Sequence, residues 1–262
     1  MKKILVFLAV LIFTGNAWAE ELNVGQIVAK ANNRSYYQGK DGRAKANMMV
    51  TDAQGRSRQR QLTILKLNIK EGSDQRYYVY FHKPNDVKGM SYIVWKHSGK
   101  DDDRWLYLPA MDLVRRIAAS DKRSSFAGTT FLYEDISGRS IDLDAHELLA
   151  GSDPAFYTIK NTPKDAGVVE FSYYTVSIDK NNFVPMKAEY FDKSGKLYRS
   201  IEALEVKEIQ GYPTVTKMKA TDLNANSSTI TEFGDIQYDL GLSNDIFTER
   251  FLRTPPQQWL KE

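Results

Sequence analysis

The chain has 262 residues, of which 42% are hydrophobic and 26% charged, which is typical of a globular protein and excludes a disordered chain or a polytopic membrane protein. It contains no cysteine, which excludes disulfide bonds, thiolate catalysis and cysteine-ligated metals. The formal net charge is only +3, and basic residues are balanced by acidic ones along the chain, so nothing indicates a nucleic-acid partner.

The first residues have the pattern of a signal peptide. Lys2 and Lys3 precede an apolar run over 4–13, and Ala17-Trp18-Ala19 provides the small residues of a cleavage site. The apolar run is too short to span a bilayer. We therefore expect cleavage after Ala19 and a periplasmic protein that starts at Glu20, with an uncleaved anchor as the alternative.

Removal of the signal peptide, 1–19, leaves 34 basic and 33 acidic residues, a net charge of +1. No linker, low-complexity tract or internal repeat divides the remainder. The sequence therefore predicts one domain over 20–262.

A helix opens the mature chain, and strands follow. Asn23 is a favourable cap for a helix over 24–33, with Ile27, Val28 and Ala31 on one face. Runs rich in Val, Ile, Thr, Tyr and Phe then alternate with turn residues, as in an antiparallel meander. The expected strands are 43–52, 57–68, 75–83, 90–97, 104–109, 112–118, 156–161, 168–178, 183–192, 196–208, 213–223 and 228–238. Weaker helical patterns cover 130–137, 144–150 and 245–252, the last ending before Pro255-Pro256.

Face alternation predicts the shape of the sheet. In 183–192, Val184, Met186, Ala188 and Tyr190 share one face, whereas 77–81 carries apolar residues on both faces. Too few helical residues are available to cover so wide a sheet, and an uncovered apolar face would aggregate. The predicted fold is therefore α+β, mainly β: a curved antiparallel sheet forming a half-open barrel closed by a few short helices. Its apolar concave face is either filled by side chains or open to a ligand.

The sequence offers no recognisable catalytic, cofactor-binding or metal-binding residues. His82, His97 and His146 lie far apart without metal-ligand spacing, and neither a nucleophile elbow nor a phosphate loop is present. Glu134-Asp135 is read as a helix end or turn cap rather than an acid/base pair. The sequence therefore does not predict an enzyme.

The segment from Asp103 to Gly138 is the least generic part of the chain. It contains Trp105-Leu106-Tyr107-Leu108-Pro109, Arg115-Arg116-Ile117, Asp121-Lys122 and the run from Ser125 to Asp135. Phe126 and Phe131 lie in an otherwise polar loop, so they either plug the core or line the mouth of a cavity.

These motifs resemble the longer branch of the outer-membrane lipoprotein-sorting family, the LolA/LolB-like proteins. Members carry W-L-Y-L-P, R-R-I and D-K followed by S-F-x-G-x-x-F-x-Y-E-D, and the resemblance covers essentially the whole mature chain. It implies a curved half-barrel with an apolar cavity that receives lipid or lipoprotein acyl chains. It also implies partnership with an inner-membrane exporter of the RND or ABC type. The lid-pinning arginine of the shorter carriers matches no motif here, so no individual cargo residue is carried over.

Three functions are open at this point. The first is a periplasmic carrier, expected to be monomeric, that passes an apolar cargo between an inner-membrane transporter and the outer membrane. The second is an accessory subunit that binds an exporter and has no cargo of its own. The third is a hydrolase with a convergent site, for which no nucleophile and base are recognisable.

Two sets of candidate residues follow from these hypotheses. The expected lining of the cavity is Trp105, Tyr107, Phe126, Phe131 and Met186. The expected contacts to an anionic head group or an acidic partner are Arg115, Arg116 and Lys122. Because neighbouring strand residues point to opposite faces, Arg115 and Arg116 cannot both lie on one side of the sheet.

Overall fold

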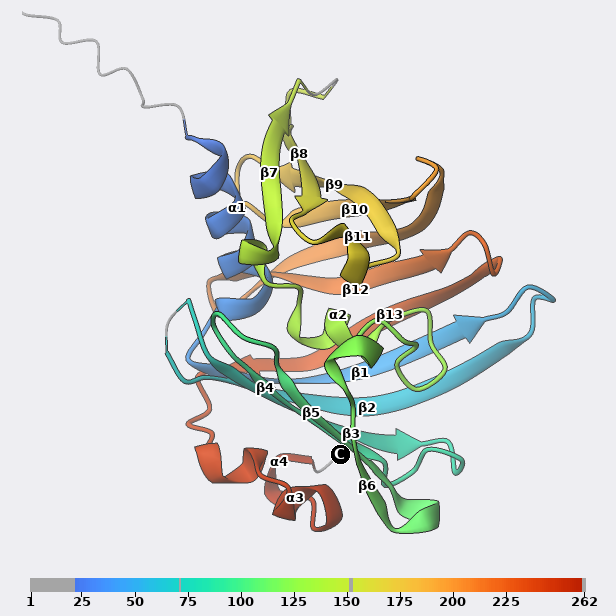
Figure 1. The fold of residues 1–262 in the computed structure, drawn as a ribbon. Helices are drawn as coiled ribbons and strands as arrows, with labels where there is room; N and C mark the ends of the chain where they lie inside the picture. The colour runs from blue at the N-terminus through green and yellow to red at the C-terminus, as the bar shows by residue number, and fades with distance from the viewer. Residues whose placement is uncertain (1–21, 71, 151–152, 261–262) are drawn as a thin grey trace, which may run out of the picture.

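Thirteen β-strands form one curled antiparallel sheet in the computed structural model, which describes residues 22–70, 72–150 and 153–260 (Figure 1). The strands are β1 (Asp41–Thr51), β2 (Ser57–Asn68), β3 (Gln75–Lys83), β4 (Ser91–Lys96), β5 (Asp103–Leu108), β6 (Leu113–Arg116), β7 (Asp144–Leu149), β8 (Phe156–Pro163), β9 (Phe171–Asp179), β10 (Pro185–Asp192), β11 (Leu197–Ile209), β12 (Tyr212–Asp222) and β13 (Ser227–Tyr238).

The sheet consists of two wings joined by one long-range pairing. The first wing consists of β1 to β6, in which each strand pairs with the next one along the chain, and the second wing consists of β7 to β13, paired in the same way. The two wings meet in the middle of the sheet, where β1 pairs with β13. Strands β6 and β7 are thus the two edges, and they do not pair with each other. The predicted curved, half-open antiparallel barrel is confirmed.

The first helix, α1 (Val24–Asn32), lies beside β7 and β8 (Figure 1). The Asn23 side chain accepts from the backbone N of Gln26, whose side chain accepts in turn from the Asn23 backbone N. Ile27, Val28 and Ala31 are buried, as predicted. A single π-helical turn, η1 (Asn33–Tyr37), leads into β1.

The chain between the two sheet edges lies inside the curve of the sheet (Figure 1). We call residues 117–143 the crossing segment. This segment contains the short helices η3 (Ala119–Asp121), α2 (Tyr133–Ser137) and η4 (Ile141–Leu143), whereas η2 (Pro109–Met111) joins β5 to β6 and η5 (Ala166–Val168) lies between β8 and β9. The predicted helix over 130–137 is thus confirmed in its second half.

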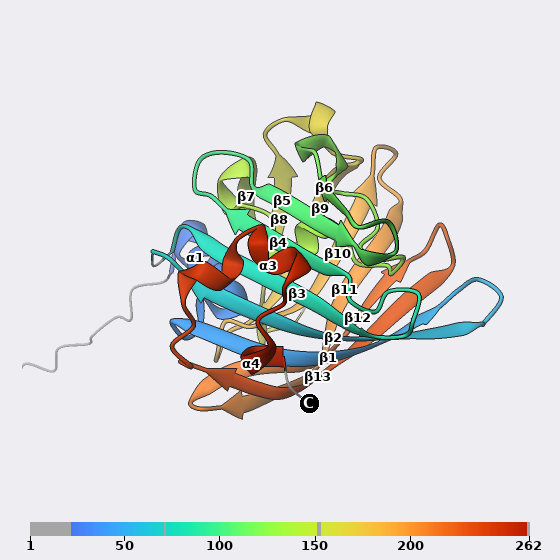
Figure 2. The ribbon, with the colours of Figure 1, turned by 90° about the horizontal axis from the view of Figure 1, so that it is seen from below.

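The C-terminal residues cover the outer, convex face of β3 to β5 (Figure 2). They form η6 (Asn244–Phe247), α3 (Arg250–Arg253) and α4 (Gln257–Leu260). The hydroxyl of Tyr78 donates to the carbonyl of Phe251 at 2.9 Å, and Trp95 Nε1 donates to the carbonyl of Phe247 at 2.6 Å. In place of the single helix predicted over 245–252, the structure has the two short helices η6 and α3. Their backbone carbonyl groups accept hydrogen bonds from side chains of the sheet.

Each of the twelve predicted strands overlaps a strand of the structure, but the helix predicted over 144–150 is wrong. These residues form β7, which pairs with β8 from Asp144–Pro163 to Leu149–Thr158. Tertiary pairing with β8 overrides the weak local helical preference. The expected signal peptide lies outside the described residues. Among the described residues, no helix combines the length and the apolar character needed to span a membrane.

Candidate functional site

The concave side of the sheet encloses a cavity of about 440 Å³, within the range of small-molecule sites. Both wings contribute apolar side chains to its wall. They include Met48, Leu62 and Ile64 from β1 and β2, and Val176, Ile178 and Phe233 from β9 and β13. The end of α1 and the crossing segment complete the wall. The cavity is therefore walled mainly by apolar side chains of the two wings.

Aromatic rings of the crossing segment close one side of the cavity. Phe126 is 1% exposed, and its ring centre lies 5.6 Å from that of Phe81, 5.4 Å from that of Tyr92 and 5.6 Å from that of Tyr133. These spacings are those of favourable aromatic pairs. Phe126 thus anchors the crossing segment on the core and also lines the cavity.

Glu134 on α2 is the centre of a buried network of charges. Its carboxylate accepts from Arg123 Nη1 at 2.6 Å and lies 3.6 Å from Arg139 Nη1 and 3.9 Å from Lys122 Nζ. The Glu134 side chain is 4% exposed. A carboxylate buried to this degree requires such cations, because the desolvation of an unpaired charge is costly.

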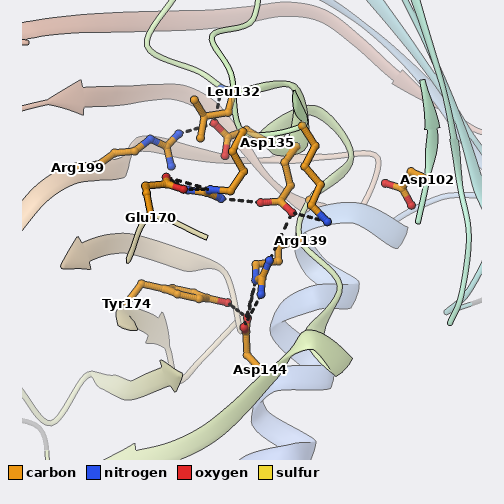
Figure 3. A network of polar contacts seen from close by, with 12 residues as sticks. Asp102, Leu132, Asp135, Arg139, Asp144, Glu170, Tyr174 and Arg199 are labelled. Carbon is orange, nitrogen blue, oxygen red and sulfur yellow. Dashed lines mark hydrogen bonds and ion pairs between the residues drawn. The ribbon is translucent and has the colours of Figure 1, made fainter. Parts of the chain in front are cut away.

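Arg139 extends the network to the edge strand β7. Its guanidinium donates to both oxygens of Asp144, at 2.9 to 3.1 Å, and Asp144 also accepts from the Tyr174 hydroxyl at 2.9 Å (Figure 3). Asp144 is fully buried at its side chain. The bidentate geometry fixes the orientation of both side chains and holds the end of the crossing segment against β7 and β9.

Two further ion pairs link the crossing segment to the second wing (Figure 3). Arg199 of β11 pairs with Asp135, which also accepts from the backbone N of Leu132 at 2.7 Å. Arg123 donates to both oxygens of Glu170 at 2.7 Å. Partial burial raises the pKa of Glu170, but hydrogen bonds from Arg123 and its charge outweigh this and lower the pKa to about 2.

Of the five predicted lining residues, the structure places Phe126 and Phe131 at the cavity wall. Trp105 and Tyr107 instead pack on the convex face with Trp95 and the C-terminal helices. Arg104 and Leu106 alternate with them and are buried on the other, concave side, so Trp105 and Tyr107 lie on the face of β5 that is turned away from the cavity.

Met186 does not line the cavity, whereas Pro185 and Ala188 do. The pairing of β10 with β9 shifts register between Pro185 and Lys187. Such an irregularity breaks the strict alternation of faces on which the prediction depended.

The three predicted basic contacts lie in different environments. Arg116 pairs with Asp103 and lies over the Trp105 ring at 5.9 Å, on the convex side. The Arg115 side chain is 60% exposed and lies 3.7 Å from Asp121. The Lys122 side chain is only 13% exposed and is engaged by Asp101 and Glu134. Arg115 and Arg116 lie on opposite faces as predicted, and Lys122 belongs to the buried network.

Sequence reasoning missed the network itself. Its members come from the crossing segment, the start of β7, the residue before β9 and the strand β11: Lys122, Arg123, Glu134, Asp135, Arg139, Asp144, Glu170 and Arg199. The available signal was the high density of charges within the aromatic run of the crossing segment. Asp135 does cap α2, as expected, but the network partners of Glu134 come from residues that no local pattern connects.

The histidines have ordinary polar partners. His97 Nε2 lies 2.9 Å from Asp103, and His146 contacts Asn161 and the carbonyl of Ile141. Among residues 22–70, 72–150 and 153–260, no group of three or more potential ligands is placed to hold a metal ion.

Comparisons with known proteins agree with this architecture. A family model described as an uncharacterized protein matches residues 73–254. A DUF1329 family protein of known structure from Desulfovibrio piger is 27% identical, with a TM-score of 0.79 over 86% of this chain and 97% of that one. A putative outer membrane lipoprotein-sorting protein domain from Vibrio parahaemolyticus is 26% identical, with a TM-score of 0.79 over 88% of this chain and all of that one.

A LolA superfamily protein from Nitrosomonas europaea shares the fold, with 16% identity and a TM-score of 0.68 over 88% of this chain and all of that one. No curated protein matches the chain. The curved sheet and its solved relatives thus define a protein of the LolA fold. The chain belongs to the family whose model matches residues 73–254, and that match fits the LolA-like branch of the lipoprotein-sorting proteins, which the sequence motifs resemble.

Proposed function

We propose that the protein is a monomeric periplasmic carrier that holds an apolar cargo, such as the acyl chains of a lipid or lipoprotein, in its concave cavity. The observation that carries this proposal is the cavity of about 440 Å³ walled by apolar side chains of both wings. An acyl chain gains about 0.8 kcal/mol per buried methylene, so such a cavity holds a chain in water and still releases it to a better acceptor.

Binding fits the polar groups of the site better than catalysis does. Glu134, Asp135 and Arg139 line the cavity, but each carboxylate is paired with a buried arginine. Such pairs fix the wall and occupy both carboxylates, so that neither is free to act as a base or nucleophile toward a cargo. We therefore propose a carrier rather than an enzyme.

The route of the cargo is proposed from the family. A relative of known structure is described as a putative outer membrane lipoprotein-sorting protein domain. We propose that this chain likewise moves its cargo from an inner-membrane exporter of the RND or ABC type toward the outer membrane.

The hairpin between β5 and β6 favours a second candidate, an accessory subunit that binds the exporter without cargo. Met111 is 64% exposed and Leu113 is 45% exposed at its tip. Exposed apolar residues of this size are frequent at interaction surfaces.

Mass spectrometry of lipid extracts from gently purified protein separates the two candidates. The carrier requires co-purified lipid or another apolar molecule in near-stoichiometric amount. A preparation free of such molecules that still captures a membrane transporter would reject the carrier in favour of the accessory subunit.

A further inference from the structure

Among the described residues of the cavity wall, the cations Arg34 and Lys66 have no carboxylate partner. Glu134 and Asp135, the two carboxylates of the lining, are both paired with arginine. By contrast, Arg34 and Lys66 also line the cavity, and neither has a carboxylate within 4.0 Å among the described residues. The wall therefore has an excess of positive charge that these residues do not neutralise.

Both cations lie at the η1 turn. Arg34 belongs to η1 itself and is half-buried. Lys66 of β2 reaches the same turn, because its Nζ donates to the carbonyl of Tyr36 at 3.1 Å and to that of Gln38 at 2.6 Å. An ammonium has three donors, so these two bonds leave one N–H of Lys66 for a ligand.

The nearest acidic groups are occupied elsewhere. The Asp41 carboxylate accepts from the backbone N atoms of residues 240–242, and Asp239 accepts from Lys40 N and the Tyr212 hydroxyl. Burial lowers the pKa of Lys66 to about 8, and the charges of Asp41 and Asp239 oppose this only in part. Lys66 is thus largely protonated at neutral pH.

The wall also has a polar acceptor at this end. Gln38 is 7% exposed and lines the cavity, and its Nε2 donates to the carbonyl of Pro213 at 2.9 Å. Its Oε1 has no hydrogen-bond partner among the described residues. A buried acceptor left in this way favours a ligand that brings a donor, such as a hydroxyl, beside its anionic group.

We propose that Lys66 and Arg34 bind the anionic head group of an amphiphile whose apolar chain occupies the rest of the cavity. The cargo is then a lipid that bears a carboxylate or phosphate rather than a neutral lipid. This inference rests on the proposed carrier function and adds the charge of the cargo to it.

The test compares the affinities of anionic and neutral ligands with the same chain, measured by native mass spectrometry or displacement of a fluorescent lipid. Palmitate and palmitoyl lysophosphatidic acid are the anionic ligands, and monopalmitoylglycerol is the neutral one. We expect the affinity of the protein for at least one of the two anions to be about tenfold or more higher than its affinity for the glycerol ester. A difference of this size corresponds to one charge-assisted hydrogen bond. Preference for palmitate alone indicates a fatty acid, and preference for the phosphate alone a phospholipid.

Three variants locate the preference. Lys66→Met and Arg34→Gln should each reduce the ratio of the affinity for the anions to the affinity for monopalmitoylglycerol, and a cooperative urea transition shows that each variant is folded. Lys70→Met, an exposed charge change outside the cavity lining, should leave the preference intact. If Lys66→Met does not fold, the ligand preference of Arg34→Gln and that of the wild type still test the head-group site.

Two results would overturn the inference in distinguishable ways. Equal affinity of the wild type for the anions and the neutral ester rejects the head-group site and leaves the carrier standing. Absence of binding by all three ligands rejects the carrier for acyl chains, and the head-group site with it.

Discussion

The ring of Tyr36 lies directly against the backbone of Gly138, so that a Cβ added to Gly138 would lie 2.4 Å from Tyr36 Cζ. Lys96 is part of the same contact, because its Nζ donates to the carbonyls of Ser137 and Gly138 and lies 5.7 Å from the Tyr36 ring. The contact joins η1, which precedes the sheet, to the end of α2. It thereby fixes the crossing segment at the cavity wall.

Gly138→Ala should lower the free energy of unfolding by about 2 to 4 kcal/mol. Gly138 has a φ of +75°, which an L-residue adopts at a cost, and the added methyl group overlaps the Tyr36 ring. Urea denaturation measures the loss. The matched control is Gly55→Ala, because Gly55 has a φ of +76° with nothing within 4 Å of the added Cβ. Equal losses in the two variants would show that the contact with Tyr36 contributes nothing.

Glu134→Gln should lower the free energy of unfolding by about 3 to 5 kcal/mol, because it leaves buried cations without their counter-charge. Arg123 and Arg139 are 8% and 9% exposed at their side chains, so water does not replace the lost carboxylate. Glu170→Gln removes a second partner of Arg123, but at a position 46% exposed at the side chain, and should cost about 1 kcal/mol or less. A loss for Glu134→Gln no greater than that for Glu170→Gln would contradict the central role of Glu134.

The sequence predicts the sheet well because strand periodicity and turn residues are local signals. It fails where a local signal is absent. In β5 the alternation is regular, but only the packing of α3 and α4 decides that Trp105 and Tyr107 face outward. In β10 the register shift at Met186 is set by pairing with β9. The charged network joins Glu134 to residues from β7 to β11, and no pattern within one segment encodes such contacts.

Glu170 should make stability depend on pH below about 5. Its pKa of about 2 in the folded state lies below its unfolded value, so its contribution is present above the unfolded pKa and is lost as pH falls toward 2. Thermal unfolding of the wild type and of Glu170→Gln, followed from pH 6 to pH 2, measures it. We expect the difference in Tm to be constant above about pH 5 and to shrink below it. If the difference in Tm between the two proteins stays the same down to pH 2, the ionised carboxylate of Glu170 does not cause it.

Lys66 should make stability depend on pH in the alkaline range, and in the same direction as Glu170 does in the acidic range. Burial lowers its folded pKa to about 8, below the value of about 10.4 for an exposed lysine. Between these values the unfolded chain binds more protons, so stability gains a contribution from Lys66 as pH rises from about 8 to 10. Comparison with Lys66→Met over that range should show a smaller rise, or a steeper fall, in Tm for the variant. Parallel pH profiles would mean that the folded and unfolded pKa values of Lys66 are alike.

A bulky side chain in the cavity should abolish cargo binding without unfolding the protein. Tyr174, Val176 and Ile178 of β9 line the cavity, whereas the intervening Thr175 does not. Because successive strand residues point to opposite faces, Val176→Trp places an indole in the cavity and Thr175→Trp places one on the convex face. Lipid extraction and mass spectrometry should recover cargo from Thr175→Trp and the wild type but at least tenfold less from Val176→Trp, with all three proteins showing cooperative unfolding. Full cargo occupancy in a folded Val176→Trp protein would place the binding site elsewhere on the molecule.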